Sequence, residues 1–213
     1  WRWCPGTTWR LDYLRGHLEN ADARVAADIL AAVGSASPAL GLQLASLTAT
    51  RPESEIQRRI LDIATAVEAA DSDTELLLSL LGSPELDVRM VTFEKLGQRG
   101  DRRAFRRLVQ QLERESAPEL EEGTAIGRAL ARVNERRAFE EFGPWIRPPG
   151  WWSQFKARNA RPELHQWTAV AAFGQLATPE AEEALVWLAK RAGNEVREHC
   201  KRALHAAREE RGS

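Results

Sequence analysis

Two stretches of the chain repeat each other at a constant shift of 34 residues. The first, SPELDVRMVTFEKLGQRGDRRAFRRL, covers residues 83–108, and the second, APELEEGTAIGRALARVNERRAFEEF, covers residues 117–142. Pro84-Glu85-Leu86 matches Pro118-Glu119-Leu120, and the Arg-Arg-Ala-Phe run at 102–105 recurs at 136–139. Agreement at one fixed shift predicts that each stretch is one structural unit of a repeat protein.

Two further copies follow at larger shifts. Residues 171–185 match the first copy at a shift of 77, and residues 195–204 match it at a shift of 108. Each unit then consists of a helix, a tight turn and a second helix. The register predicts that Leu96, Leu130, Phe173 and Leu204 occupy equivalent buried positions in successive first helices.

Apolar residues recur with helical spacing along the whole chain. In the segment 53–69 they fall on Ile56, Ile60, Ile63 and Val67, with Thr50 and Glu53 placed as a capping box. Glycine and proline signals separate about a dozen such segments; at Gly82-Ser83-Pro84, for example, we expect proline at the first position of the next helix. No stretch shows sustained strand alternation. The sequence therefore predicts an all-α protein.

The repeated residues resemble those of bacterial short-repeat HEAT proteins. The pattern is carried by three sets of residues: Val88, Arg89, Leu96, Gly97, Asp101, Ala104 and Leu108; Ala169, Ala172, Gly174, Pro179, Ala181 and Leu185; Val196, Arg197, Ala203 and Leu204. The resemblance implies a right-handed α-solenoid of about five or six HEAT-like helix pairs that serves as a binding scaffold. Residues 1–82 would form an N-terminal helical cap with degenerate repeats, including 21–34, and residues 83–213 the HEAT-like repeats.

An insertion interrupts the spacing between the second and third copies. It adds nine residues that fall within 142–161, and we place the aromatic and basic insertion at 143–161. Insertions in solenoids form loops on one face, which is often the binding face. The candidate partner-binding residues are therefore Trp145, Arg147, Trp151, Trp152, Phe155, Lys156 and Arg158. The alternative is that these rings only cover the gap between helix pairs, because large aromatic side chains usually pack within their own protein.

A second candidate surface is charged. It consists of exposed arginines on two successive second helices, namely Arg102, Arg103, Arg106, Arg107, Arg136 and Arg137. Such a run could meet phosphates, which makes a nucleic-acid-binding solenoid the main alternative function. Glu140 and Glu141, however, stand where the first copy has Arg106 and Arg107, so the sign of the charge alternates between units.

The sequence offers no catalytic motif and no metal or cofactor motif. His199 and Cys200 are adjacent in a helix and therefore point in different directions, and Cys200 continues an apolar stripe. His17, His165 and His205 are expected to be surface residues. Cys4 and Cys200 form no disulfide framework, which is typical of a reducing, cytoplasmic compartment, and the net charge is only -1.

These observations predict a non-catalytic protein-interaction scaffold or regulatory module that acts without a cofactor on a protein partner. No apolar run in the sequence is long enough to span a membrane. Because the chain starts at Trp1, we expect it to be part of a longer protein. A third possibility is thus a soluble regulatory domain of a larger membrane-anchored or enzyme-containing chain.

Overall fold

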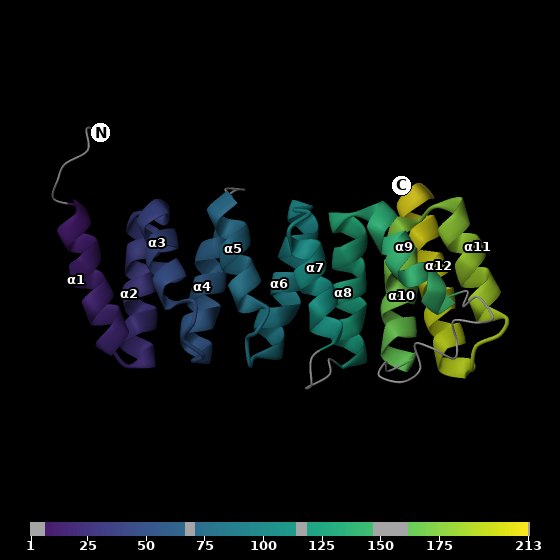
Figure 1. Cartoon of the computed structure of the whole chain (residues 1–213), viewed down its shortest axis with the longest axis horizontal. Helices are drawn as coiled ribbons and strands as arrows, with labels where there is room; N and C mark the ends of the chain where they lie inside the picture. The colour runs from purple at the N-terminus through teal and green to yellow at the C-terminus, as the bar shows by residue number, and fades with distance from the viewer. Residues whose placement is uncertain (1–6, 67–70, 114–118, 147–161, 213) are drawn as a thin grey trace. The chain divides into compact units, whose positions relative to one another are not determined.

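The computed structural model describes residues 7–66, 71–113, 119–146 and 162–212. These residues form helices and turns without a strand (Figure 1), which confirms the predicted all-α class. The helices are α1 (Thr7–Asn20), α2 (Ala23–Ala36), α3 (Pro38–Thr48), α4 (Ser54–Ala66), α5 (Asp71–Leu80), α6 (Leu86–Arg99), α7 (Ala104–Leu112), α8 (Leu120–Val133), α9 (Glu135–Ile146), α10 (Pro162–Leu176), α11 (Pro179–Ala189) and α12 (Asn194–Gly212). Within the described residues, none of these helices has the length and apolar character needed to cross a membrane.

Helix ends follow the local signals in the sequence. Ser37 separates α2 from α3, and α3 has a proline at its start. Thr178 caps α11, because its side chain accepts a hydrogen bond from the Ala181 amide at 3.2 Å. Gly100 ends α6 with φ +64°, a backbone conformation that side chains with a Cβ rarely adopt. These boundaries depend on local chemistry, so the sequence alone could predict them.

Two predicted helix starts differ from the structure. We expected Pro84 at the first position of its helix, but α6 begins at Leu86. Thr50 and Glu53 do not form a capping box, because α4 begins at Ser54 and the Glu53 carboxylate instead accepts two hydrogen bonds from Arg51. This ion pair lowers the pKa of Glu53, chiefly through the Arg51 hydrogen bond.

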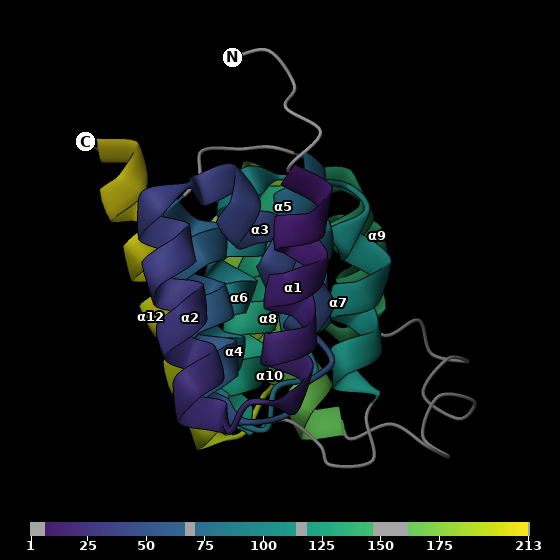
Figure 2. The same ribbon diagram turned by 90° about the vertical axis from the view of Figure 1, so that its left-hand side faces the viewer.

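The chain divides into two compact units, residues 1–92 and 93–213, with the division inside α6. In the first unit α2 packs against α3 and α4, and α1 covers α2 and α3. Figure 2 shows α1 and α2 side by side at the end nearest the viewer. The core consists of aliphatic side chains that are fully buried, including Leu30, Leu44, Ile56, Ile60 and Leu77.

Arg51 connects three segments of the first unit. Its guanidinium donates to the carbonyl oxygens of Leu18 at 2.7 Å and Ala21 at 3.2 Å, where α1 ends. The same side chain holds Glu53 before α4. Because the last carbonyl groups of a helix have no partner within the helix, an arginine that reaches them satisfies the end of α1 and fixes its position relative to α4.

In the second unit, α10 packs against α8 and α12, while α9 and α11 lie beside α10. Close approach between neighbours depends on small residues. A methyl group added at Gly97 of α6 would lie 2.9 Å from Ala129 Cα of α8, and one at Gly174 of α10 would lie 2.9 Å from Ala203 Cβ of α12. In the repeat register Gly97 matches Gly174 and Ala129 matches Ala203. The same contact thus recurs between two pairs of first helices.

The side chains chosen from the repeat register are mostly buried. Leu96 and Leu130 are 0% exposed and Phe173 is 1% exposed, as predicted. Leu204 is only half-buried, so the prediction of equivalent burial is wrong for α12. α12 comes last among the first helices, and within the described residues no later helix covers it.

Candidate functional site

Most of the predicted partner-binding insertion lies outside the described residues. This applies to Arg147, Trp151, Trp152, Phe155, Lys156 and Arg158. Trp145 is described, and it belongs to the last turn of α9, which continues through Pro144 to Ile146. The assignment of Trp145 to an inserted loop is therefore wrong.

Trp145 stacks on His165 of α10. The two ring centroids lie 4.3 Å apart at an interplanar angle of 27°, and both side chains are half-buried. The prediction that His165 is a simple surface residue is also wrong, because its imidazole packs against a tryptophan of another helix. For Trp145, the packing role is the one that the structure shows.

A second tryptophan–histidine pair lies between α10 and α12. Trp167 stacks on His199 with centroids 4.2 Å apart and an interplanar angle of 22°. His199 is 8% exposed, and its Nε2 atom has no hydrogen-bond partner in the described part of the chain. Sequence reasoning missed Trp167. In the repeat register His199 matches Thr168 of α10. Trp167 directly precedes Thr168, so the register could have indicated that Trp167 lies close to His199.

Burial lowers the pKa of His199 to about 4, because the charged imidazolium loses its hydration. The backbone of Trp167 acts in the opposite direction, and the positive charges of Arg202 and Arg128 lower the pKa further. At neutral pH the imidazole is therefore uncharged. A neutral ring stacks against the indole without an ionic desolvation cost.

We expect His199 to make the protein less stable in acid. Its ordinary pKa of 6.5 applies to the unfolded chain, so between pH 6.5 and about 4 the unfolded state binds the proton and the folded state does not. The free energy of unfolding should fall over this interval by up to about 3 kcal/mol more in the wild type than in His199→Gln. Urea unfolding at a series of pH values measures the difference.

The control for this experiment is His205→Gln, because His205 is exposed on the same helix. This variant should still show the loss of stability in acid that His199 causes. An unchanged pH dependence in His199→Gln would show that His199 titrates normally in the folded protein.

The buried cysteine is not activated. Cys200 is 0% exposed, and burial raises the pKa of its thiol to about 11. The reactive form of cysteine is the thiolate, which is negligible at neutral pH with such a pKa. The prediction that Cys200 belongs to the core is confirmed. Within the described residues no group of three or more histidine, cysteine or acidic side chains could hold a metal ion.

The predicted arginine face is divided by local interactions. Arg103 pairs with Asp101 at 2.6 Å, and Arg136 pairs with Glu140 of its own helix at 2.9 Å. Arg137 places its guanidinium carbon 4.8 Å from the centroid of the Phe105 ring. Three of the six candidate arginines are thus engaged with neighbouring side chains.

The other three arginines of this face are exposed. Arg102, Arg106 and Arg107 form no ion pair with any described residue. On α9, Glu140 and Glu141 occupy the repeat positions of Arg106 and Arg107, and both are exposed. Phe139 of α9 is 39% exposed and stacks on Phe173. The surface of α7 and α9 is therefore of mixed charge with an aromatic side chain, as the alternation in the sequence indicates.

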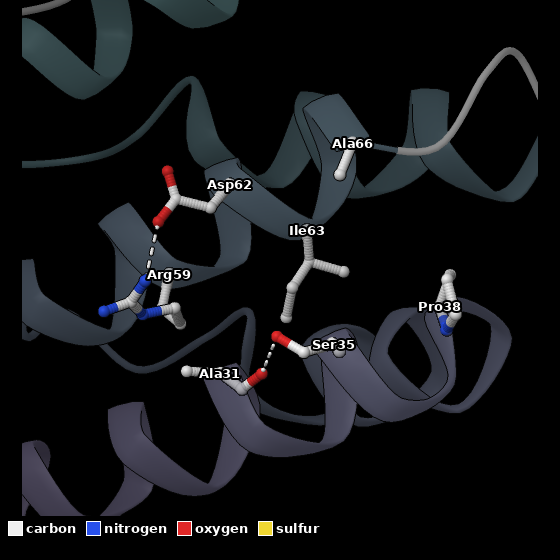
Figure 3. A pocket seen from close by; sticks show the side chains of 8 residues that line it. Ala31, Ser35, Pro38, Arg59, Asp62, Ile63 and Ala66 are labelled. Atoms are coloured by element: carbon white, nitrogen blue, oxygen red, sulfur yellow. Dashed lines mark hydrogen bonds and ion pairs between the residues drawn. The ribbon is translucent and has the colours of Figure 1, made fainter.

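A shallow pocket of about 190 Å³ lies in the first unit between α2 and α4 (Figure 3). Its polar side chains are already bonded: Arg59 pairs with Asp62 at 3.1 Å, and the Ser35 hydroxyl donates to the Ala31 carbonyl at 2.9 Å. Ile63 forms part of its apolar wall. The volume is below the usual range for small-molecule sites, so the pocket is suited to one apolar side chain at most.

In the described part of the chain, these positions give two tryptophan–histidine contacts and a mixed-charge surface. Comparison with models of known protein families gives no match, and comparison with curated proteins gives none either.

Proposed function

We propose that the chain is a non-catalytic protein-interaction module built as a right-handed HEAT-type α-solenoid. The observation that carries the proposal is the recurring contact of Gly97 with Ala129 and of Gly174 with Ala203. Helix pairs that meet their neighbours through the same small residues can continue as a stack, because each pair covers the apolar face of the next. Such stacks expose long surfaces that bind proteins.

A repeated arginine further supports the repeat register. Arg89 follows Val88 and donates to the carbonyl oxygens of Ser83 at 2.8 Å and Pro84 at 3.0 Å. Arg197 follows Val196 and donates to the carbonyl oxygens of Ala189 at 3.0 Å and Ala192 at 3.1 Å. In each case the arginine of the repeated Val-Arg pair binds the backbone that leads into its own helix.

The chemistry of the buried residues favours binding over catalysis. Burial keeps His199 neutral and Cys200 protonated at neutral pH, so each residue serves as packing. On the surface of α7 and α9, exposed Phe139 lies among cations and anions that are partly paired with each other. Aromatic and arginine side chains in such settings are typical of protein interfaces.

Nucleic-acid binding is the second candidate, and one observation favours it. Arg102, Arg106 and Arg107 are exposed cations that form no ion pair within the described residues. Phosphate binding nevertheless needs a continuous basic surface, and Glu140 and Glu141 lie at the positions where the next unit would extend it. We therefore rank a protein partner first.

Affinity capture with the full chain distinguishes the two functions. A protein partner should remain bound after treatment with nucleases and at physiological salt. Binding through phosphates should instead be lost after nuclease treatment and should fall steeply as salt rises. Submicromolar binding of the purified chain to DNA or RNA at physiological salt would contradict the proposal.

Once a partner is captured, Trp151→Ala tests the predicted role of the insertion. We expect the variant to bind the partner with about 2 kcal/mol less free energy, or roughly thirtyfold more weakly, with an almost unchanged melting temperature. Isothermal titration and thermal unfolding give the two values. A lower melting temperature with unchanged affinity would instead assign Trp151 to packing.

A further inference from the structure

Four side chains of the second unit lie on three neighbouring helices. We call them the Trp167 cluster: Arg128 of α8, Trp167 of α10, and His199 and Arg202 of α12. The three helices are neighbours, because α10 packs against both α8 and α12 (Figure 1). The stack of Trp167 on His199 fixes the indole ring at the junction of α10 and α12.

Positive charge lies on both helices that flank α10, namely α8 and α12. Arg128 and Arg202 both lie close enough to His199 to lower its pKa, although burial is the larger cause. Both arginines are exposed, and the charge of Arg202 also acts on Glu198, one turn earlier in α12. In the repeat register each corresponds to Ala171 of α10, so the middle helix contributes a small side chain between the two cations.

The cluster consists of hydrogen-bond donors around an aromatic face. Each guanidinium carries several N–H groups in a planar fork that fits a carboxylate, and the half-buried indole of Trp167 adds one N–H. His199 Nε2 is buried and has no hydrogen-bond partner in the described part of the chain. An anionic group with an apolar neighbour therefore complements the cluster.

Acidic residues limit the size of this anionic partner. Glu163 is exposed one turn before Trp167 on α10, and Glu198 precedes Arg202 by one turn on α12. Glu198 is bonded to Lys201 at 2.7 Å and keeps its negative charge, because that hydrogen bond lowers its pKa. A polynucleotide that crossed these helices would meet both carboxylates, whereas a short acidic segment of a protein would not need to.

We propose that the Trp167 cluster binds a short acidic segment of a partner protein, with carboxylates on Arg128 and Arg202 and an apolar residue against Trp167. This inference rests on the proposed function as a protein-interaction module. Charge-assisted bonds to arginine are stronger than neutral hydrogen bonds, and tryptophan with arginine is the usual composition of a binding hot spot. The ring stack keeps the indole in place before binding, which reduces the ordering cost.

A direct test uses the full chain and a short dye-labelled peptide with glutamates on both sides of a central Leu-Phe pair. We expect fluorescence anisotropy to show binding that weakens about tenfold or more in the double variant Arg128→Glu/Arg202→Glu. The matched control is Arg24→Glu/Lys190→Glu, which changes two exposed cations outside both candidate surfaces, makes the same change in net charge and should bind within about twofold of the wild type. Arg128→Lys/Arg202→Lys should retain part of the affinity, because lysine keeps the charge but loses the planar fork.

Several outcomes would overturn the inference. They are no peptide binding by the wild type, equal weakening in both charge-reversed variants, and equal binding of the same peptide with glutamines in place of glutamates. A single-stranded oligonucleotide that bound through Arg128 and Arg202 as tightly as the peptide would assign the cluster to phosphate instead. Both arginines are exposed, so the variants should fold, and thermal unfolding checks this.

The test also separates this inference from the broader proposal. A captured protein partner that stays bound to Arg128→Glu/Arg202→Glu would place its binding surface elsewhere while the chain remained an interaction module. Loss of every partner on nuclease treatment would contradict the module itself.

Discussion

Replacement of Gly127 by alanine should lower the free energy of unfolding of the second unit by about 3 kcal/mol or more. A methyl group at this position of α8 would collide with the carbonyl oxygen of Thr168 and would lie 3.2 Å from the amide nitrogen of Ala172. Both are backbone atoms of α10, so relief requires the two helices to move apart. Overpacking of this kind usually costs about 1–3 kcal/mol, and the rigid backbone contact places Gly127→Ala at or above the upper end.

The matched control is Gly143→Ala in α9, where an added methyl group would meet nothing within 4 Å. Alanine is a better helix former than glycine by about 1 kcal/mol, so this variant should be unchanged or slightly more stable. Urea unfolding of both variants measures the contrast. Equal stability of the two variants would show that α8 and α10 are not in close backbone contact.

Leu96→Ala should cost about 2–5 kcal/mol of unfolding free energy. Leu96 is 0% exposed in α6, so truncation removes buried methyl groups and leaves a cavity. Leu204→Ala removes the same atoms from the equivalent position of α12, where the side chain is only half-buried. It should therefore cost about 1 kcal/mol or less.

The two leucine variants test burial at one repeat position in two settings. Chemical denaturation with a common baseline gives both values. If Leu204→Ala cost as much as Leu96→Ala, the end of the repeat would be covered as fully as its interior. If Leu96→Ala cost less than 1 kcal/mol, the repeat register would not mark the core.

The sequence predicted the elements of this fold because helix formation depends on neighbouring residues. Thr178 caps α11 and Gly100 ends α6 through interactions within a few residues of each, and the spacing of Ile56, Ile60 and Ile63 marks the buried side of α4. The starts of α4 and α6 were wrong. At α4 the cause is Arg51, which binds carbonyl groups near residue 20 as well as Glu53. No local pattern contains that contact.

The candidate sites depended much more on contacts between helices. Sequence reasoning treated Trp145 as part of an exposed insertion and His165 as a surface residue, yet the two rings stack between α9 and α10. The sequence alone did not indicate the Trp167 cluster, because Arg128, Trp167 and Arg202 are far apart in the chain. Each looks ordinary in its own helix, and only the packing of α8, α10 and α12 brings them together.

By itself, the sequence determined that the chain is helical, where most helices end and which side of each helix is apolar, since these properties follow from local geometry and a period of 3.6 residues. It also determined the repeat register, which predicts that Leu96, Leu130 and Phe173 are buried. Only the tertiary structure decided which aromatic rings pack internally and which cations remain exposed. The physical reason is that a side chain's partners on neighbouring helices depend on how closely those helices approach each other. Between α8 and α10 this distance depends on Gly127, where one added methyl group would not fit.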